Sequence, residues 1–129
     1  HAQIRTKSRL PIQMGENWWG PHEMAKGIAA GASDLGMPDA MKIGGVTGWM
    51  RAAAIAESAG LPLSSHLFPE ISAHLLAVSA TCHWRECVDW AKPGLQEPLR
   101  IENGCAVVAD EPGSGIRWDE ANVERYLAA

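Results

Sequence analysis

The chain has 129 residues, of which 47% are hydrophobic and 20% are charged, and its formal net charge is −4. These proportions are those of an ordinary folded domain and exclude an intrinsically disordered chain, and no apolar run approaches the roughly 18 residues of a membrane-spanning helix. The acidic balance argues against a nucleic-acid partner, because such proteins normally carry a basic patch.

Short apolar segments alternate with Ala- and Gly-rich segments up to about residue 90. They predict strands over 10–14, 35–37, 61–66 and 83–88, and helices over 21–32, 46–59 and 69–78. Gly15 closes the first strand, and Pro21 suits the first turn of the helix that follows. Gly60 suits the position just past the end of the second helix.

The alternation of strands and helices predicts βαβ units around a parallel sheet. One ionisable residue lies near the end of each strand: Glu16, Asp39, His66 and Glu86. In a (β/α)8 barrel the active-site residues project from the carboxyl ends of successive strands, and the spacing fits that pattern. A doubly wound open sheet is the alternative, since it also places polar groups at strand ends. A closed barrel needs about 250 residues, so four strands are about half of one.

The alternation stops after the fourth predicted strand. Two short strands over 99–102 and 105–108 flank Asn103-Gly104, a strong hairpin signal. Asp119 is placed to cap a final helix over 119–127. We therefore expect residues 1–90 to belong to the catalytic barrel and residues 91–129 to form a separate hairpin and helix segment.

The three cysteines are too few, and odd in number, for a disulfide framework, and they favour a reducing compartment, the cytoplasm. The first residues lack the apolar stretch of a signal peptide. Since the chain starts at His1 rather than at a methionine, we expect it to be processed or to be a piece of a longer protein.

Asp39 and His66 are a candidate base pair, because a carboxylate bonded to an imidazole fixes its tautomer and raises its basicity. The alternative is that both are surface residues that never meet. Glu16 follows a glycine at a strand end, where a hard cation such as Mg²⁺ favours a carboxylate oxygen, although an exposed loop position is the alternative. Glu86 lies near Trp84 and other apolar residues, which would keep a carboxyl group protonated; pairing with an arginine is the alternative.

Three further patterns carry weaker signals. A zinc site would have to use His74, Cys82, His83 and Cys87. Their spacing matches no closed Cys/His zinc pattern. The glycine-rich segment 44–48 precedes a helix but is neither a P-loop nor a dinucleotide fingerprint, so a tight turn is the better interpretation. Trp18 and Trp19 line a pocket or pack in the barrel, and the sequence leaves both alternatives open.

Four segments together carry a family resemblance: 13–18, 37–49, 64–68 and 70–76. They closely resemble the mandelate racemase family of the enolase superfamily, in order and over essentially the whole chain. The resemblance implies a modified (β/α)8 barrel, of which this chain is the C-terminal half. It also implies that the C-terminal segment packs on an N-terminal capping domain.

The resemblance implies roles for individual residues. Glu16 resembles the third carboxylate ligand of an essential Mg²⁺, and Asp39 with His66 resembles the general-base dyad. Glu86 resembles the acid that hydrogen-bonds the substrate carboxylate. Lys42 resembles a supporting electrostatic residue. Trp18 and Asn17 are expected in the substrate pocket.

The family's Lys-x-Lys base motif, its first two metal carboxylates and its capping domain are expected before His1. The implied partners are a small-molecule carboxylate substrate and the remaining half of the protein or another copy of the chain, in a homo-oligomer, with no nucleic acid and no membrane. Racemisation of mandelate or a similar 2-hydroxy acid is the leading hypothesis. Dehydration of a sugar acid is the second, and a catalytically silent packing module is the third.

Overall fold

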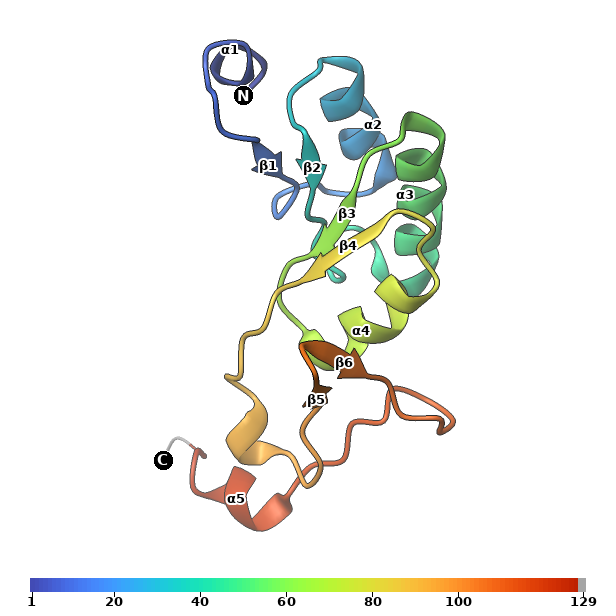
Figure 1. The fold of residues 1–129 in the computed structure, drawn as a ribbon. Helices are drawn as coiled ribbons and strands as arrows, with labels where there is room; N and C mark the ends of the chain where they lie inside the picture. Colours follow the sequence, from blue (N-terminus) through green and yellow to red (C-terminus); the bar gives the residue numbers. More distant parts are fainter. Residues whose placement is uncertain (128–129) are drawn as a thin grey trace.

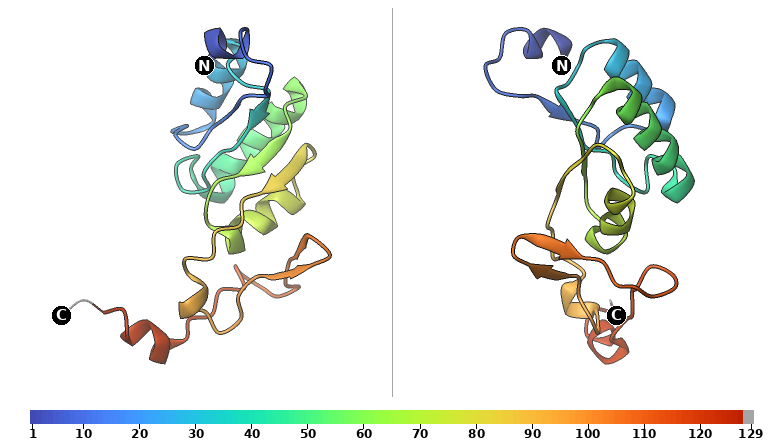
Figure 2. Two further views of the ribbon diagram at one scale, coloured as in Figure 1. Left: turned by 60° about the vertical axis from the view of Figure 1, so that its left-hand side comes forward. Right: turned by 45° about the vertical axis from the view of Figure 1, so that its right-hand side comes forward.

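The computed structural model describes residues 1–127. Four strands form a parallel sheet in the order β1-β2-β3-β4: β1 (Gln13–Met14), β2 (Leu35–Gly36), β3 (Leu63–Ser65) and β4 (Cys82–Arg85). Three longer helices connect them: α2 (Pro21–Ala29), α3 (Gly45–Ala59) and α4 (Pro69–Ala77). The helices lie along one face of the sheet (Figures 1 and 2). The strand order follows the sequence without a reversal, so the doubly wound alternative is wrong and the chain forms an arc of a (β/α) barrel.

The ends of the helices follow from local chemistry. Pro21 stands in the first turn of α2, where its fixed φ suits a helix and its missing N–H costs no hydrogen bond. Gly60 ends α3 with a left-handed φ of 61°, and its N–H and that of Leu61 bond back to the last turn. Both predicted helix boundaries are confirmed.

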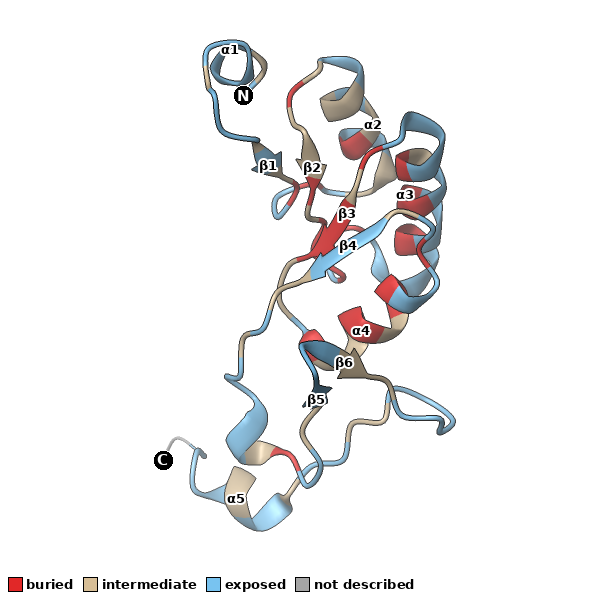
Figure 3. Cartoon of the chain, in the orientation of Figure 1, coloured by how far each residue is buried: buried red, intermediate tan, exposed pale blue. Residues whose placement is uncertain are grey.

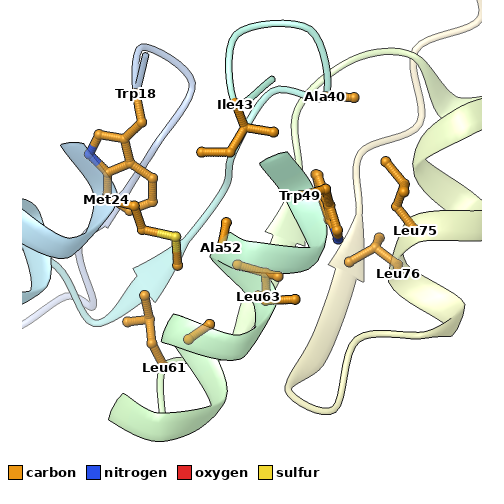
Figure 4. Packing of buried hydrophobic residues seen from close by; sticks show 12 residues of the cluster. Trp18, Met24, Ala40, Ile43, Trp49, Ala52, Leu61, Leu63, Leu75 and Leu76 are labelled. Atoms are coloured by element: carbon orange, nitrogen blue, oxygen red, sulfur yellow. The ribbon is translucent and has the colours of Figure 1, made fainter. Parts of the chain in front are cut away.

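The core lies between the sheet and the helices. Its fully buried side chains include Met24 on α2, Trp49 on α3 and Leu63 on β3 (Figures 3 and 4). Each large apolar side chain removed from water in this way contributes roughly 1.5–3 kcal/mol. The indole N–H of Trp49 donates to the Ser79 hydroxyl at 3.0 Å, so its polar atom is satisfied. This packing holds β2 and β3, whose ends carry Asp39 and His66, in one rigid unit.

Trp18 packs into a space that three glycines leave open. A Cβ added at Gly15, Gly27 or Gly36 would lie 2.8, 3.2 or 3.6 Å from the Trp18 ring. Trp18 is only 5% exposed, whereas the adjacent Trp19 is 71% exposed. Trp18 therefore packs in the core, as the packing alternative has it, and its expected place in the substrate pocket stays a prediction.

Beyond β4 the chain forms a 3-10 turn (η1, Lys92–Gly94), a hairpin of β5 (Arg100–Glu102) and β6 (Cys105–Val107), and α5 (Glu120–Glu124). Asn103 and Gly104 both have positive φ, at 50° and 79°, as a tight hairpin turn requires. The Asp119 carboxylate accepts the Asn122 N–H at 3.1 Å and caps α5, as predicted. This segment lies beyond the carboxyl end of the sheet (Figure 1).

Several predicted boundaries need correction. The strands are shorter than expected, because they end where pairing with the neighbouring strand ends, and α5 stops before 127. The first helix, α1 (Ala2–Arg5), and η1 were not predicted. Residues 128 and 129, the end of the expected C-terminal segment, lie outside the described residues. Within the described part of the chain, no helix has both the length and the apolar character needed to cross a membrane.

Candidate active site

The four predicted site residues follow the carboxyl ends of the four consecutive strands. His66 and Glu86 come directly after β3 and β4, Glu16 lies two residues after β1, and Asp39 lies three residues after β2. Since all four strands are parallel, these ends share one edge of the sheet. The contacts described below link Glu16, Asp39 and His66 in one group, while Glu86 bonds the backbone N–H of Leu67, the residue next to His66.

Asp39 and His66 are in direct contact. Nδ1 of His66 lies 2.9 Å from Oδ2 of Asp39, and the two residues form a parallel bridge beyond the ends of β2 and β3. The His66 N–H donates to the Pro38 carbonyl at 3.2 Å, which fixes the backbone of the pair. The predicted contact between Asp39 and His66 is therefore confirmed.

The Asp39 carboxylate is oriented by the chain that follows it. It is 2% exposed, and its Oδ1 accepts the backbone N–H groups of Met41 at 2.8 Å and Lys42 at 3.1 Å. Oδ2 is thereby left for the imidazole. A carboxylate oxygen can only accept, so the proton of a neutral His66 ring sits on Nδ1 and Nε2 keeps its lone pair.

Nε2 of His66 faces Glu16, whose Oε2 lies 3.5 Å away, and this contact is attractive only when the imidazole is protonated. Oε1 of Glu16 accepts from the Asn17 amide at 3.2 Å, and the Asn17 carbonyl accepts from Nζ of Lys42 at 2.8 Å. The backbone N–H of Lys42 bonds Asp39, so these five residues form a closed ring of polar contacts. Asn17 is therefore engaged with Glu16 and Lys42, and its expected place in the substrate pocket stays a prediction.

The Glu86 side chain is held by backbone. Its Oε2 accepts the N–H of Leu67 at 2.7 Å, and its own N–H donates to the Ser65 hydroxyl at 3.3 Å. The expected apolar wall is wrong, because Trp84 and Trp90 are 69% and 79% exposed. They lie on and just after β4, an edge strand with no neighbour beyond it within residues 1–127.

The weaker sequence patterns give no site. In residues 1–127 no three His, Cys, Asp or Glu side chains come together as a metal centre would require, and the three cysteines are free and exposed. Gly44, with φ of 103°, forms the tight turn that precedes α3, and its carbonyl accepts the N–H of Gly48. The turn interpretation of this glycine-rich segment is therefore confirmed.

Sequence reasoning missed the groups that contact Glu86 and their support. These are the Leu67 peptide, the Ser65 hydroxyl and the Ser72 hydroxyl, which donates to the Leu67 carbonyl. A backbone N–H is common to nearly all residue types, so no pattern identifies the one that will face a carboxylate. The available signal in the sequence was the presence of Ser65 and Ser72 among apolar residues, since buried hydroxyls need hydrogen-bond partners.

Comparison with known structures places this geometry in context. An enolase from Bradyrhizobium, solved in complex with magnesium and mandelic acid, is 50% identical, with a TM-score of 0.93 over 100% of this chain and 36% of that one. An enolase from an alphaproteobacterium, BAL199, solved with bound magnesium, is also 50% identical, with a TM-score of 0.93 over 96% of this chain and 34% of that one.

A curated relative, the L-talarate/galactarate dehydratase of Salmonella typhimurium, is 30% identical over 93% of this chain and 30% of its own length. The chain thus spans about a third of the length of the relatives it matches. The sequence model of the family described as "Enolase C-terminal domain-like" matches residues 1–122. On this match and the shared barrel architecture, the chain belongs to the enolase C-terminal domain-like family.

Proposed function

We propose that this chain supplies part of an active site that removes the α-proton of a 2-hydroxycarboxylate, and that the reaction is racemisation of mandelate or a similar 2-hydroxy acid. The observation that carries the proposal is the 2.9 Å contact between buried Asp39 and His66. The Bradyrhizobium relative with magnesium and mandelic acid supports this substrate class at 50% identity.

His66 is the base in this proposal. Its Nε2 lone pair takes the α-proton from one face of the substrate, and for inversion the second base, which we expect from the Lys-x-Lys motif, delivers a proton to the opposite face. The imidazolium formed in this step is stabilised by Asp39, whose carboxylate stays ionised and oriented by two backbone N–H donors. The side chain of His66 is 17% exposed, so a substrate can reach it while most of the ring stays fixed.

Glu16 is the residue that we assign to Mg²⁺. Its carboxylate offers the hard oxygen donor that Mg²⁺ prefers, and with 52% of the side chain exposed it can turn toward a cation. Bound Mg²⁺ would supply Lewis-acid stabilisation of the negative charge that develops on the substrate carboxylate. Asn17 holds one oxygen of Glu16, and Lys42 acts through Asn17, which leaves the other oxygen for the cation.

Glu86 acts as the hydrogen-bond donor to the substrate carboxylate. A protonated Glu86 with Oε2 accepting from Leu67 has Oε1 free to carry the proton. A fixed donor of this kind strengthens its hydrogen bond as enediolate charge develops, so it lowers the barrier more than it raises affinity. It serves proton removal from either face.

Dehydration of a sugar acid is a second candidate. It is favoured by the names of the curated relatives, which include L-talarate/galactarate dehydratase and the D-gluconate dehydratase of Thermoproteus tenax, at 30% and 29% identity. The same His66–Asp39 base can begin both reactions, since each starts with removal of an α-proton. The two candidates differ in the product, which is an enantiomer in one case and a keto acid in the other.

Association with the rest of the protein or with a second copy remains a prediction. β1 and β4 each leave one edge unpaired within residues 1–127, and such edges favour pairing with a neighbouring strand.

The test of the function is exchange of the α-hydrogen in deuterated water by the full-length protein with Mg²⁺, measured by proton NMR for each mandelate enantiomer separately. His66→Asn should abolish exchange for one enantiomer and leave it for the other. Glu86→Gln should lower exchange for both, roughly 10²–10⁴-fold. His74→Asn on α4 is the control and should change neither.

Equal loss for both enantiomers in His66→Asn, or an effect of Glu86→Gln on one enantiomer alone, would overturn the assignment of roles. Keto-acid formation from a panel of sugar acids, without racemisation of mandelate, would replace the first candidate by the second.

A further inference from the structure

The loop between β3 and α4 holds two consecutive non-glycine residues in the left-handed region. Leu67 has φ of 51° and Phe68 has φ of 46°. Side chains make this conformation unfavourable by roughly 1–3 kcal/mol for each residue, so it persists only where surrounding contacts hold it. The loop directly follows His66, at the edge of the sheet that carries the proposed site.

The contacts that hold this loop lead to Glu86. The N–H of Leu67 donates to Oε2 of Glu86 at 2.7 Å, and the carbonyl of Leu67 accepts from the Ser72 hydroxyl at 2.8 Å. The backbone N–H of Ser72 donates to the Phe68 carbonyl at 2.8 Å. Ser72 thus bonds both left-handed residues, and it is completely buried on α4.

The orientation of this Ser72 bond is unusual for a serine in a helix. Such hydroxyls commonly bond the carbonyl three or four residues earlier, within their own helix. Here the partner lies five residues earlier, outside α4, in the strained loop. Water cannot reach this fully buried position to replace the Ser72 hydroxyl. Loss of the hydroxyl would therefore leave the Leu67 carbonyl without this hydrogen bond and free the loop to relax.

The direction of the Leu67 N–H determines which oxygen of Glu86 can carry a proton. An oxygen that accepts an N–H bond at 2.7 Å favours the carbonyl form, so the proton of a neutral carboxyl group resides on Oε1. We propose that Ser72 is a positioning residue for Glu86, acting through the left-handed Leu67 peptide to present Oε1–H to the substrate. This inference rests on the proposed function, in which Glu86 is the hydrogen-bond donor.

The chain offers a matched control for a purely structural role. Ser79 is 6% exposed, and its hydroxyl donates to the Leu75 carbonyl at 2.7 Å and accepts from Trp49. Ser79→Ala therefore removes a buried serine hydroxyl with two partners, but none of its contacts involves the loop or Glu86.

The experiment compares Ser72→Ala, Ser79→Ala, Glu86→Gln and the double variant Ser72→Ala/Glu86→Gln in the full-length protein with Mg²⁺. We measure α-hydrogen exchange for both enantiomers and the thermal unfolding midpoint. Ser72→Ala should lower exchange about 10- to 100-fold for both, the range for a displaced catalytic group, with KM nearly unchanged. Ser79→Ala should lower the unfolding midpoint and leave exchange unchanged. In the Glu86→Gln background, Ser72→Ala should have no further effect on exchange.

Equal exchange in Ser72→Ala and Ser79→Ala, or additive effects in the double variant, would overturn the role of Ser72 while leaving that of Glu86 intact. Wild-type exchange in Glu86→Gln would overturn the proposed function, and the inference with it. If Ser72→Ala does not fold, Ser72→Thr and Ser72→Val carry the same test, because they share a shape and differ in the hydroxyl. Thr should retain exchange and Val should lose it, and equal rates would overturn the inference.

Discussion

Asp39→Asn is the most informative single change, because the structure determines which way the new amide must face. Oδ1 of Asp39 accepts two backbone N–H groups, at 2.8 and 3.1 Å. An amide nitrogen cannot take that place, because its N–H groups would face the two backbone N–H groups, and all of these are donors. The amide oxygen must therefore stay with the backbone, and the NH₂ group must face Nδ1 of His66, 2.9 Å away in the wild type.

This orientation reverses the tautomer of the imidazole. Nδ1 of His66 becomes the acceptor, and the ring proton moves to Nε2, which then has no lone pair to receive the α-proton. In another enzyme with a catalytic Asp–His pair, the same substitution lowers turnover about 10⁴-fold through the wrong tautomer. We expect a loss of roughly 10³–10⁴-fold, which is about 4–5.5 kcal/mol of barrier.

The assay is α-hydrogen exchange in the full-length protein with Mg²⁺, for the enantiomer whose exchange depends on His66. The control is Asp34→Asn, which alters a carboxylate that bonds the Ile12 N–H and Arg5, near the opposite end of β2. It should leave exchange unchanged. Exchange in Asp39→Asn within about threefold of the wild type, with the fold intact, would refute the assignment of the Nε2 lone pair, since threefold is well under 1 kcal/mol.

Two further predictions concern stability. Gly48→Ala should destabilise the fold by about 1–3 kcal/mol in denaturant unfolding, because its Cβ would clash with the Ile43 carbonyl oxygen; an unchanged midpoint would contradict the tight approach of these two backbones. The Ile12 N–H bond and Arg5 lower the pKa of Asp34 from its ordinary value of 3.8, so ionised Asp34 stabilises the fold above that pH and the contribution fades as the pH falls through the lowered pKa. The difference in thermal midpoint between wild type and Asp34→Asn should therefore shrink below about pH 4, and a constant difference would contradict it.

The order of the elements and the placement of the site could be predicted from the sequence, because each depends on local signals. Pro21 and Gly60 mark helix boundaries whatever the tertiary structure. One ionisable residue near each strand end made Asp39 and His66 a candidate pair, since parallel strands bring their carboxyl ends to one edge, and the structure shows them in contact. Strand lengths could not be predicted in this way, because they depend on where the neighbouring strand stops pairing.

The adjacent residues Trp18 and Trp19 show where local reasoning fails. Both are equally apolar, yet one is buried and the other is exposed. The difference comes from a space around Trp18 that Gly15, Gly27 and Gly36 leave open, and two of these glycines lie on other elements, α2 and β2. For the same reason, the contact of Leu67 with Glu86 could not be predicted, since it depends on the backbone rather than on the side chain.

Glu16 stands between two residues that the core immobilises. Gly15 needs its φ of 142° to make the turn and has no room for a side chain, because the Trp18 ring fills the space. Trp18 in turn packs against that glycine, three residues before it in the chain. The packing of the core and the placement of the Glu16 carboxylate are therefore coupled at this point. A substitution that enlarges Gly15 or shrinks Trp18 should change where the Glu16 carboxylate can reach, although Glu16 itself is unchanged. Mutational tolerance at these two positions should follow the tolerance of Glu16 itself, although neither carries a reactive group.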